Sequence, residues 1–286
     1  MNTIKTFILM LALTLLLLLT GLIWTGDPSG VIIFLFIALG INFIAFWSSD
    51  RLVLKMSKAR LVEPDEAPEL HAIVDEEVHL AGIPKPKVFI MESDSPNAFA
   101  TGRSKKHASI AVTAGIQRIL NRDELGGVIA HELAHVGNRD TLIMTVVAAM
   151  AMAIGLIAMI ARFSMFFGGF GGRGRGGHSA TGLVGLLVIA IVMPLVAVII
   201  RMAISRSREF QADRTGALTS GKALALASAL DKLHQTTQKK PMELSQERLE
   251  SVSHLFIVNP LKGNGMTRLF STHPPVEERI RRLEEM

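Results

Sequence analysis

The sequence predicts a mainly α-helical membrane protein that also contains a small β-sheet. The first observation is a set of four long apolar runs, each long enough to cross a bilayer as a helix. The second is a pair of histidines four residues apart in a helical stretch, where the chain has the character of a soluble protein. The third is two short segments rich in β-branched residues in that same part. We therefore expect a soluble part with a metal centre, fused to about four transmembrane helices.

The composition excludes several kinds of site. The chain has 286 residues, 49% of them hydrophobic, a mean hydropathy of +0.39 and no cysteine. A disulfide or a thiolate metal site is therefore impossible, and any metal must be held by histidine and carboxylate. The formal net charge is +5, but the lysines and arginines gather at the ends of the apolar runs. That pattern is typical of membrane topology, so we expect the membrane as a partner and no nucleic acid.

Residues 1–50 are expected to form an amino-terminal transmembrane hairpin. Its first apolar run, Phe7–Ile23, resembles a signal peptide, but its core is long and no small-x-small cleavage site follows. The second run, Val31–Trp47, begins after a short connection with one acidic charge. The basic residues that follow this second run are Arg51, Lys55, Lys58 and Arg60. By the positive-inside rule, both ends of the hairpin lie in the cytoplasm.

Residues 51–140 are expected to form the first part of a soluble domain. A helix is predicted over 64–81 and ends at Gly82. Three of its side chains lie four residues apart on one face: His71, Asp75 and His79. They could mimic a metal site, but acidic neighbours favour a solvated surface face. Two strands are then predicted, Val88–Met91 and Ala108–Thr113, joined by a turn-rich segment.

The stretch Val128–Asn138 carries a His-Glu-x-x-His motif, formed by His131, Glu132 and His135. On a helix the two histidines lie on one face and offer both imidazoles to a single metal ion, while Glu132 projects beside that ion. Two neutral imidazoles with a carboxylate over an open coordination position describe a hydrolytic zinc centre. The alternative is a surface helix with two solvated histidines. The mostly apolar surroundings disfavour it, because buried imidazoles without partners are costly.

Residues 141–200 are expected to form a second apolar hairpin that spans the membrane. Its two runs, Thr141–Ile160 and Thr181–Ile200, contain no charged residue. The connection Arg162–Ala180 includes the tract GGFGGRGRGG, which we interpret as a flexible loop and not as a nucleic-acid-binding segment. If both runs cross, the three arginines of this loop lie outside, against the positive-inside rule. A hairpin that enters the bilayer only partly, or packs on the soluble domain, is the alternative.

Residues 201–286 are expected to complete the soluble domain and to supply a third metal ligand. Zinc sites of hydrolases usually have three protein ligands, with the fourth position left for water. Glu209, in a helix predicted over 205–218, is the best candidate because it lies on the same side of the membrane as His131 in either topology. Asp213 is about one helical turn further on and could orient a ligating histidine through its second ring nitrogen. The alternative is a charged juxtamembrane helix with ordinary ion pairs.

Three segments, in this order, carry a resemblance to a known family. They are HELAHVGNRD around the two histidines, the later SREFQAD, and Phe270–Pro275. A pair of apolar runs is inserted between the first two segments. With these features the chain resembles, over nearly its whole length, the HtpX membrane metalloproteases, relatives of the CAAX prenyl-protein proteases. The resemblance implies a zincin-like (gluzincin) catalytic domain with one zinc ion per chain. By motif position, the zinc ligands are His131, His135 and Glu209, and Glu132 is the general base.

The resemblance adds two expectations about substrate handling. His273 matches a histidine proposed to stabilise the transition state. An equal alternative is that His273 only caps the turn before two prolines. The segment Asn97, Ala98, Phe99 and Ala100 resembles an edge strand beside the cleft, where an extended substrate pairs by β-augmentation.

The activity implied is that of a membrane-embedded zinc-dependent endopeptidase. It would cleave damaged or misfolded membrane proteins at the cytoplasmic face of the bacterial inner membrane, as part of stress-linked quality control. A CAAX-type processing protease of lipidated substrates is the alternative enzyme, and a non-catalytic zinc-binding membrane scaffold is the alternative outside enzymes. A transporter is disfavoured because none of the four apolar runs contains a charged residue or a histidine. The oligomeric state and the physiological substrate are not predicted.

Overall fold

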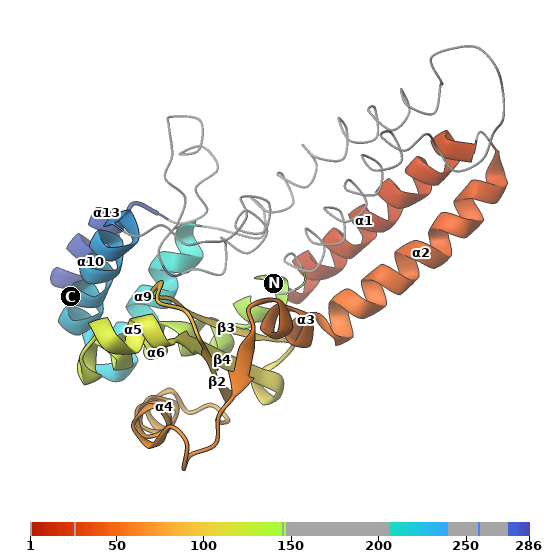
Figure 1. Ribbon diagram of the computed structural model, residues 1–286. Helices are drawn as coiled ribbons and strands as arrows, with labels where there is room; N and C mark the ends of the chain where they lie inside the picture. Colours follow the sequence, from red (N-terminus) through yellow and green to blue (C-terminus); the bar gives the residue numbers. More distant parts are fainter. Residues whose placement is uncertain (1, 26, 145, 147–205, 240–256, 258–273) are drawn as a thin grey trace.

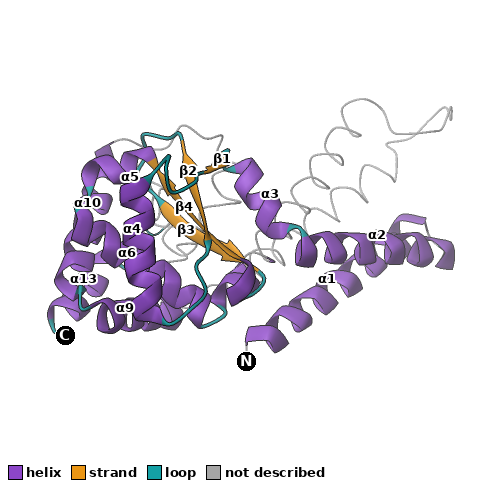
Figure 2. Ribbon diagram, turned by 90° about the horizontal axis from the view of Figure 1, so that it is seen from below, coloured by secondary structure: helices purple, strands orange, loops and turns teal. Residues whose placement is uncertain are grey.

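The computed structural model describes residues 2–25, 27–144, 146, 206–239, 257 and 274–286, and Figure 1 shows their arrangement. Across these residues the protein is mostly helical and contains one small mixed sheet. Two long helices project away from a body in which further helices pack around the sheet (Figures 1 and 2). The predicted combination of a mainly helical chain with a small sheet is therefore confirmed.

The projecting helices are α1 (Asn2–Thr25) and α2 (Pro28–Trp47), which run side by side as a hairpin. The side-chain amide of Asn42 donates to Thr14 Oγ1 at 2.7 Å and ties the two helices together. Among the described residues, α2 is the one helix that is long and apolar enough to cross a membrane. The second predicted hairpin, 141–200, lies almost wholly outside the described residues, so four transmembrane helices remain a prediction.

A four-stranded sheet packs beside the short helix α3 (Ser49–Met56). Its strands are β1 (Ala59–Leu61), β2 (Lys87–Met91), β3 (Ala98–Gly102) and β4 (Ala108–Thr113). Their order is β1-β2-β4-β3, with β2 and β4 parallel and the other neighbours antiparallel. The two strands predicted from β-branched residues are confirmed as β2 and β4, whereas the sequence pattern does not predict β1. Strand β3 lies at one edge of this sheet, so half of its backbone groups face away from β4.

Helix α4 (Pro68–Ala81) begins later than predicted, because residues 64–67 lie outside the helix, and ends at Gly82 in a left-handed conformation with φ of 62°. That conformation is the usual helix stop. The prediction of a solvated face is wrong for His71, which is buried and has Nε2 3.0 Å from the carbonyl oxygen of Val62. The covering segment precedes α4 in the chain, so helical spacing alone could not reveal the contact. The other two residues of that face are exposed, as predicted.

Helix α6 (Arg122–Gly137) occupies the centre of the body and follows the short α5 (Ala114–Ile119). A capping box fixes its start: Asn121 Oδ1 accepts from the backbone N–H of Glu124, and Glu124 Oε2 accepts from the backbone N–H of Asn121, both at 2.9 Å. All residues from Glu124 to Val136 are buried, because α4, β3, α9 and α10 pack around the helix. A polar side chain on such a helix needs a protein partner or a ligand.

Three helices from the later part of the chain complete the body. They are α9 (Arg206–Ser220), α10 (Ala223–Lys239) and α13 (Val276–Glu284). The helix predicted over 205–218 is thereby confirmed as α9. It approaches α6 closely at Gly216, where an added Cβ would lie 2.9 Å from the backbone nitrogen of His131. Glycine at this position lets α9 bring its acidic side chains next to the histidines of α6.

Replacing Gly216 with alanine is expected to lower the free energy of unfolding by about 1–3 kcal/mol, because the new methyl group would meet the backbone of α6. The two helices would move apart, so metal affinity should fall as well. Thermal unfolding and a metal titration measure the two effects. Gly137→Ala is the matched control on α6, since nothing lies within 4 Å of its added Cβ, and its stability should be unchanged or slightly higher. Equal stabilities of the two variants would contradict the close approach.

Candidate metal centre

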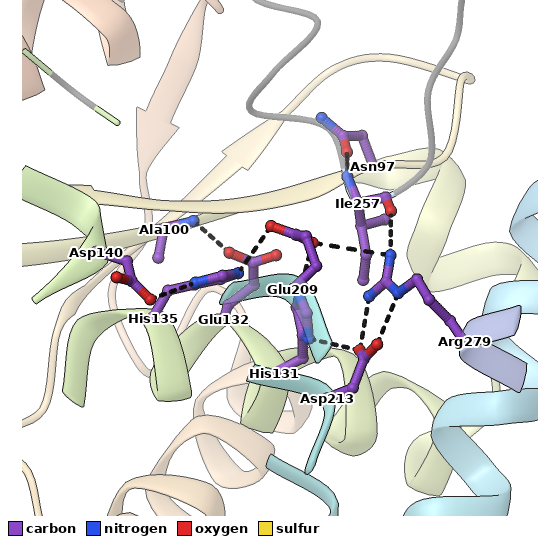
Figure 3. Close-up of polar contacts among 10 residues, drawn as sticks. All are labelled: Asn97, Ala100, His131, Glu132, His135, Asp140, Glu209, Asp213, Ile257 and Arg279. Carbon is purple, nitrogen blue, oxygen red and sulfur yellow. Dashed lines mark hydrogen bonds and ion pairs between the residues drawn. The ribbon is translucent and has the colours of Figure 1, made fainter. Parts of the chain in front are cut away.

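The two histidines of α6 lie on one face of the helix, as their spacing predicts (Figure 3). Their ring centroids are 4.8 Å apart, and the rings are nearly perpendicular, with an interplanar angle of 88°. Only 1% of His131 and 3% of His135 is exposed. Neither is therefore the solvated surface histidine of the alternative interpretation, and both need polar partners in the interior.

Glu209 comes from the first turn of α9 and is buried beside both histidines. Its Oε2 lies 3.7 Å from His131 Nε2, and its Oε1 lies 3.6 Å from His135 Nε2. These distances are too long for direct hydrogen bonds. One ligand atom from each of the three residues lies within 4.8 Å of the other two, an arrangement that could hold a single metal ion.

A carboxylate contacts the other ring nitrogen of each histidine. Asp213 Oδ1 lies 2.9 Å from His131 Nδ1, and Asp140 Oδ2 lies 3.2 Å from His135 Nδ1. Each carboxylate favours a proton on Nδ1, so Nε2, which faces Glu209, is the ring nitrogen that remains for a metal ion. Asp213 lies where helical spacing places it. Asp140 is not predicted by spacing, because a turn after α6 brings it back toward the helix.

Arg279 of α13 extends this network from a distant part of the sequence (Figure 3). Its Nε and Nη2 donate to the two carboxylate oxygens of Asp213 at 2.8 and 2.7 Å, and its Nη1 donates to the carbonyl oxygen of Ile257 at 2.9 Å. Burial opposes ionisation of Asp213, but the charge and hydrogen bonds of Arg279 hold the pKa of that carboxyl well below its usual range. Arg279 is itself 0% exposed. Sequence reasoning misses it because its helix has the charge pattern of an ordinary surface helix.

Glu132 turns toward strand β3. Its Oε2 accepts a hydrogen bond from the backbone N–H of Ala100 at 2.9 Å. Burial raises the pKa of the Glu132 carboxyl and the charge of Glu209 acts in the same direction, whereas the two histidines and the Ala100 N–H oppose them. A carboxyl group with a raised pKa, fixed next to the three ligand atoms, is suited to accept a proton and to return it.

The charge around the histidines favours a cation. Carboxylates of Glu132, Asp140, Glu209 and Asp213 surround the two imidazoles. Burial disfavours the charged form of His135, but its hydrogen bond to Asp140 and the charges of Glu209 and Glu132 outweigh burial and raise the pKa of His135 to about 9. The same negative field would stabilise a divalent cation between the Nε2 atoms, so the residues present fit a metal ion.

Comparison with known proteins agrees with this geometry. The sequence model that describes peptidase family M48 matches residues 64–286 of this chain. The chain belongs to this family. Two similar proteins are both named "Protease HtpX homolog". The one from Thermococcus kodakarensis is 51% identical over 283 residues, which are 99% of this chain and 95% of the relative. The one from Thermodesulfovibrio yellowstonii is 50% identical over 286 residues, which are 100% of this chain and 99% of the relative. The predicted resemblance to HtpX proteases is confirmed, and membership of M48 makes the chain a metalloprotease.

A solved structure shares the fold of this M48 chain. The crystal structure of S. mikatae Ste24p aligns with a TM-score of 0.56 at 20% sequence identity, over 99% of this chain and 65% of that one. At this level of identity the likeness shows the architecture alone.

The M48 fold brings most of the predicted site residues together. Those that meet in one cluster are His131, Glu132, His135, Glu209 and Asp213. Ala98, Phe99 and Ala100 lie in the edge strand β3, and Ala100 contacts the cluster directly. Asn97 precedes β3, and its Oδ1 accepts a hydrogen bond from the backbone N–H of Ile257 at 3.3 Å. His273 lies outside the described residues, so its role stays a prediction.

Proposed function

We propose that this M48 protease is a zinc-dependent endopeptidase that holds one zinc ion per chain. The observation that carries the proposal is the convergence of His131 Nε2, His135 Nε2 and the Glu209 carboxylate within 4.8 Å. Two imidazoles and a carboxylate, in a chain without cysteine, suit catalytic zinc better than other divalent metals. When bound, zinc would supply Lewis-acid polarisation of the scissile carbonyl and would lower the pKa of water.

The side chains around the ligands have distinct tasks in this proposal. Glu132 takes a proton from the attacking water and passes it to the leaving amine. The Ala100 N–H, 2.9 Å from Glu132 Oε2, keeps that carboxylate fixed against β3. Asp213 and Asp140 hold the two imidazoles in place through Nδ1. His273 is a candidate for stabilising the negative charge that develops on the carbonyl oxygen.

The proposed organisation is a membrane-embedded protease in four segments. Residues 1–50 form a transmembrane hairpin, which the length and the exposed apolar surface of α2 support. Residues 51–140 and 201–286 form the two parts of the catalytic domain, which the packing of α9 and α10 on α6 supports. Residues 141–200 form the second hairpin. The positive-inside rule supports a catalytic domain on the cytoplasmic side, and the membrane in this proposal is the bacterial inner membrane.

The substrates that we propose are damaged or misfolded membrane proteins, cleaved as part of a stress response. Strand β3 supports this choice, because it is an edge strand among the described strands and its Ala100 N–H contacts Glu132. An extended substrate segment would pair with the main chain of β3, and main-chain pairing needs little side-chain specificity. Segments that have lost their fold can supply such a strand, whereas folded proteins rarely can.

Glu209→Gln is expected to weaken zinc binding by roughly 100-fold or more and to abolish cleavage of an unfolded protein, because the neutral amide is a poor zinc ligand. Zinc content after dialysis is measured by elemental analysis, and cleavage is measured in detergent on the same preparation. Glu284→Gln, an exposed residue of α13, is the matched control and should keep both properties. One tightly held zinc ion per chain in Glu209→Gln would contradict the ligand assignment.

The same purified protein separates the proposal from its alternatives. Chelation should stop cleavage of an unfolded protein, and added zinc should restore it. Preferential cleavage of a prenylated peptide would instead support a CAAX-type processing protease. Zinc binding without cleavage of either substrate would support a non-catalytic scaffold.

A further inference from the structure

Two segments next to the carboxyl-terminal end of α2 carry a group of basic side chains. They come from α3 with the turn that follows it, and from the β3–β4 connection, which contains the short 3₁₀ helix η1 (Lys105–His107). We call this group the basic surface; its members are Arg51, Lys55, Lys58, Arg103, Lys105 and Lys106. All six are exposed or partly exposed.

Two contacts bring the two segments of the basic surface together. The guanidinium of Arg103 lies over the ring of Trp47, the last residue of α2, at 4.9 Å from the ring centroid. Helix α3 packs on the sheet through Val53 and Leu54, which share a buried cluster with Phe99 of β3. The β3–β4 connection is therefore held at the end of α2, and α3, which carries the other cations, packs on the same sheet.

The basic surface has almost no neutralising acid. In the described part of the chain, none of its six side chains forms an ion pair with a carboxylate. The neighbouring Asp50, in the first turn of α3, uses Oδ1 to accept the backbone N–H of Arg51 at 2.8 Å. By contrast, the nearby Arg60 pairs with Glu66 at 2.8 Å. A cluster of unpaired charges of one sign attracts ligands of the opposite sign.

The adjoining apolar surface identifies the class of anion. Large apolar side chains remain exposed on α2 up to its last residue; they include Phe36, Leu39, Phe43, Ile44 and Trp47. A tryptophan at the boundary between an apolar helix and a basic segment is the arrangement found at membrane surfaces. In a lipid bilayer the hydrocarbon core would contact the apolar helix, and anionic headgroups would contact the basic surface next to it. A soluble polyanion could bind the basic surface but would leave the apolar helix exposed to water.

We propose that the basic surface binds the headgroups of anionic phospholipids, an inference that rests on the proposed membrane insertion of α2. The lipid phosphates lie against the cations of α3 and of the β3–β4 connection. Strand β3 leads directly from Ala100, which holds Glu132, to Arg103 at the edge of the basic surface. Lipid binding therefore anchors the edge strand of the active site at the bilayer surface.

Trp47 provides a test that does not depend on proteolysis. The chain has two tryptophans, Trp24 and Trp47, so Trp24→Phe leaves Trp47 as the single indole fluorophore. This protein is reconstituted in vesicles of equal parts phosphatidylcholine and phosphatidylglycerol, in which one lipid or the other carries brominated acyl chains. We expect brominated phosphatidylglycerol to quench Trp47 roughly twofold more than brominated phosphatidylcholine, because the basic surface enriches the anionic lipid around it. The difference should shrink at high salt.

Charge variants decide whether the basic surface causes the preference. Lys55→Gln, Lys105→Gln and Lys106→Gln are combined, because this set leaves the Arg103–Trp47 contact intact. Quenching by the two lipids should become equal. The matched control combines Arg118→Gln, Arg122→Gln and Arg281→Gln, which removes the same charge from exposed ion pairs elsewhere and should keep the preference.

The outcomes separate this inference from the proposed function. Equal quenching by both lipids before any charge is removed, or an unchanged preference in the lysine variant, would overturn the headgroup site while leaving the insertion of α2 intact. Absence of quenching by either lipid would overturn the insertion itself and the headgroup site with it. A preference for the anionic lipid in a protein that cleaves nothing would support the headgroup site and refute the protease proposal alone.

Discussion

Replacing Glu132 with glutamine is expected to reduce the rate of proteolysis by about 10²–10⁴-fold while the metal stays bound. Glutamine has nearly the same size as glutamate, and its amide oxygen can still accept the N–H of Ala100, which lies 2.9 Å from Glu132 Oε2. The contact between α6 and β3 should therefore survive. The variant loses only the ability to take and return a proton, so kcat for an unfolded protein should fall with little change in KM.

Metal content and thermal unfolding, measured on the same preparation, distinguish loss of the base from loss of the site. The Glu132→Gln protein should keep one zinc ion per chain and unfold close to the temperature of the parent. Glu92→Gln, an exposed residue after β2, serves as the matched control and should cleave normally. Normal turnover by Glu132→Gln would refute the assignment of the general base.

Arg279→Met is expected to lower the free energy of unfolding by about 3–5 kcal/mol, because it leaves the buried charge of Asp213 without its partner. The carbonyl oxygen of Ile257 also loses its donor. Since Asp213 contacts His131 Nδ1 at 2.9 Å, the orientation of that imidazole should suffer, and zinc affinity should fall about 10–100-fold. Denaturant unfolding and competitive zinc titration measure the two losses.

Two further variants test the origin of this effect. Arg281→Met, on the same helix, removes an exposed pair with Glu285 and should cost less than about 1 kcal/mol. Combining Arg279→Met with Asp213→Asn removes both buried charges and should recover part of the stability. If the single and the double variant were equally unstable, the loss would reflect packing of the arginine side chain and not the uncompensated carboxylate.

The metal-ligand residues could be predicted because their relative positions follow from helical spacing within each of two segments. The spacing of His131 and His135 fixes their common helical face, and the same spacing relates Glu209 to Asp213. Strands β2 and β4 could be predicted from their β-branched residues. Strand β3 could not be predicted from its own pattern, because it consists mostly of small residues, and only the resemblance to a family indicated it.

Contacts made outside a single helix or strand could not be predicted. His71 is buried and contacts the carbonyl oxygen of Val62 in the preceding segment, although the sequence pattern of its helix predicts a solvated face there. Arg279 lies in a helix with charged residues on several sides, and nothing local distinguishes it from Arg281, which is exposed. Which of two such arginines is buried depends on the packing of α13 against α9, and a single sequence does not reveal that packing.

The position of Arg279 also bears on the biosynthesis of the protease. It lies 66 residues after Asp213, the carboxylate that it pairs with, and later still than the two histidines. A ribosome therefore delivers the His-Glu-x-x-His segment first, then Asp140, Glu209 and Asp213, and the guanidinium only after a long further stretch of translation. Until α13 emerges and docks, the nascent chain carries an uncompensated carboxylate at its metal centre. The buried ion pair that stabilises Asp213 therefore forms late in synthesis, after all the other groups of the network are present.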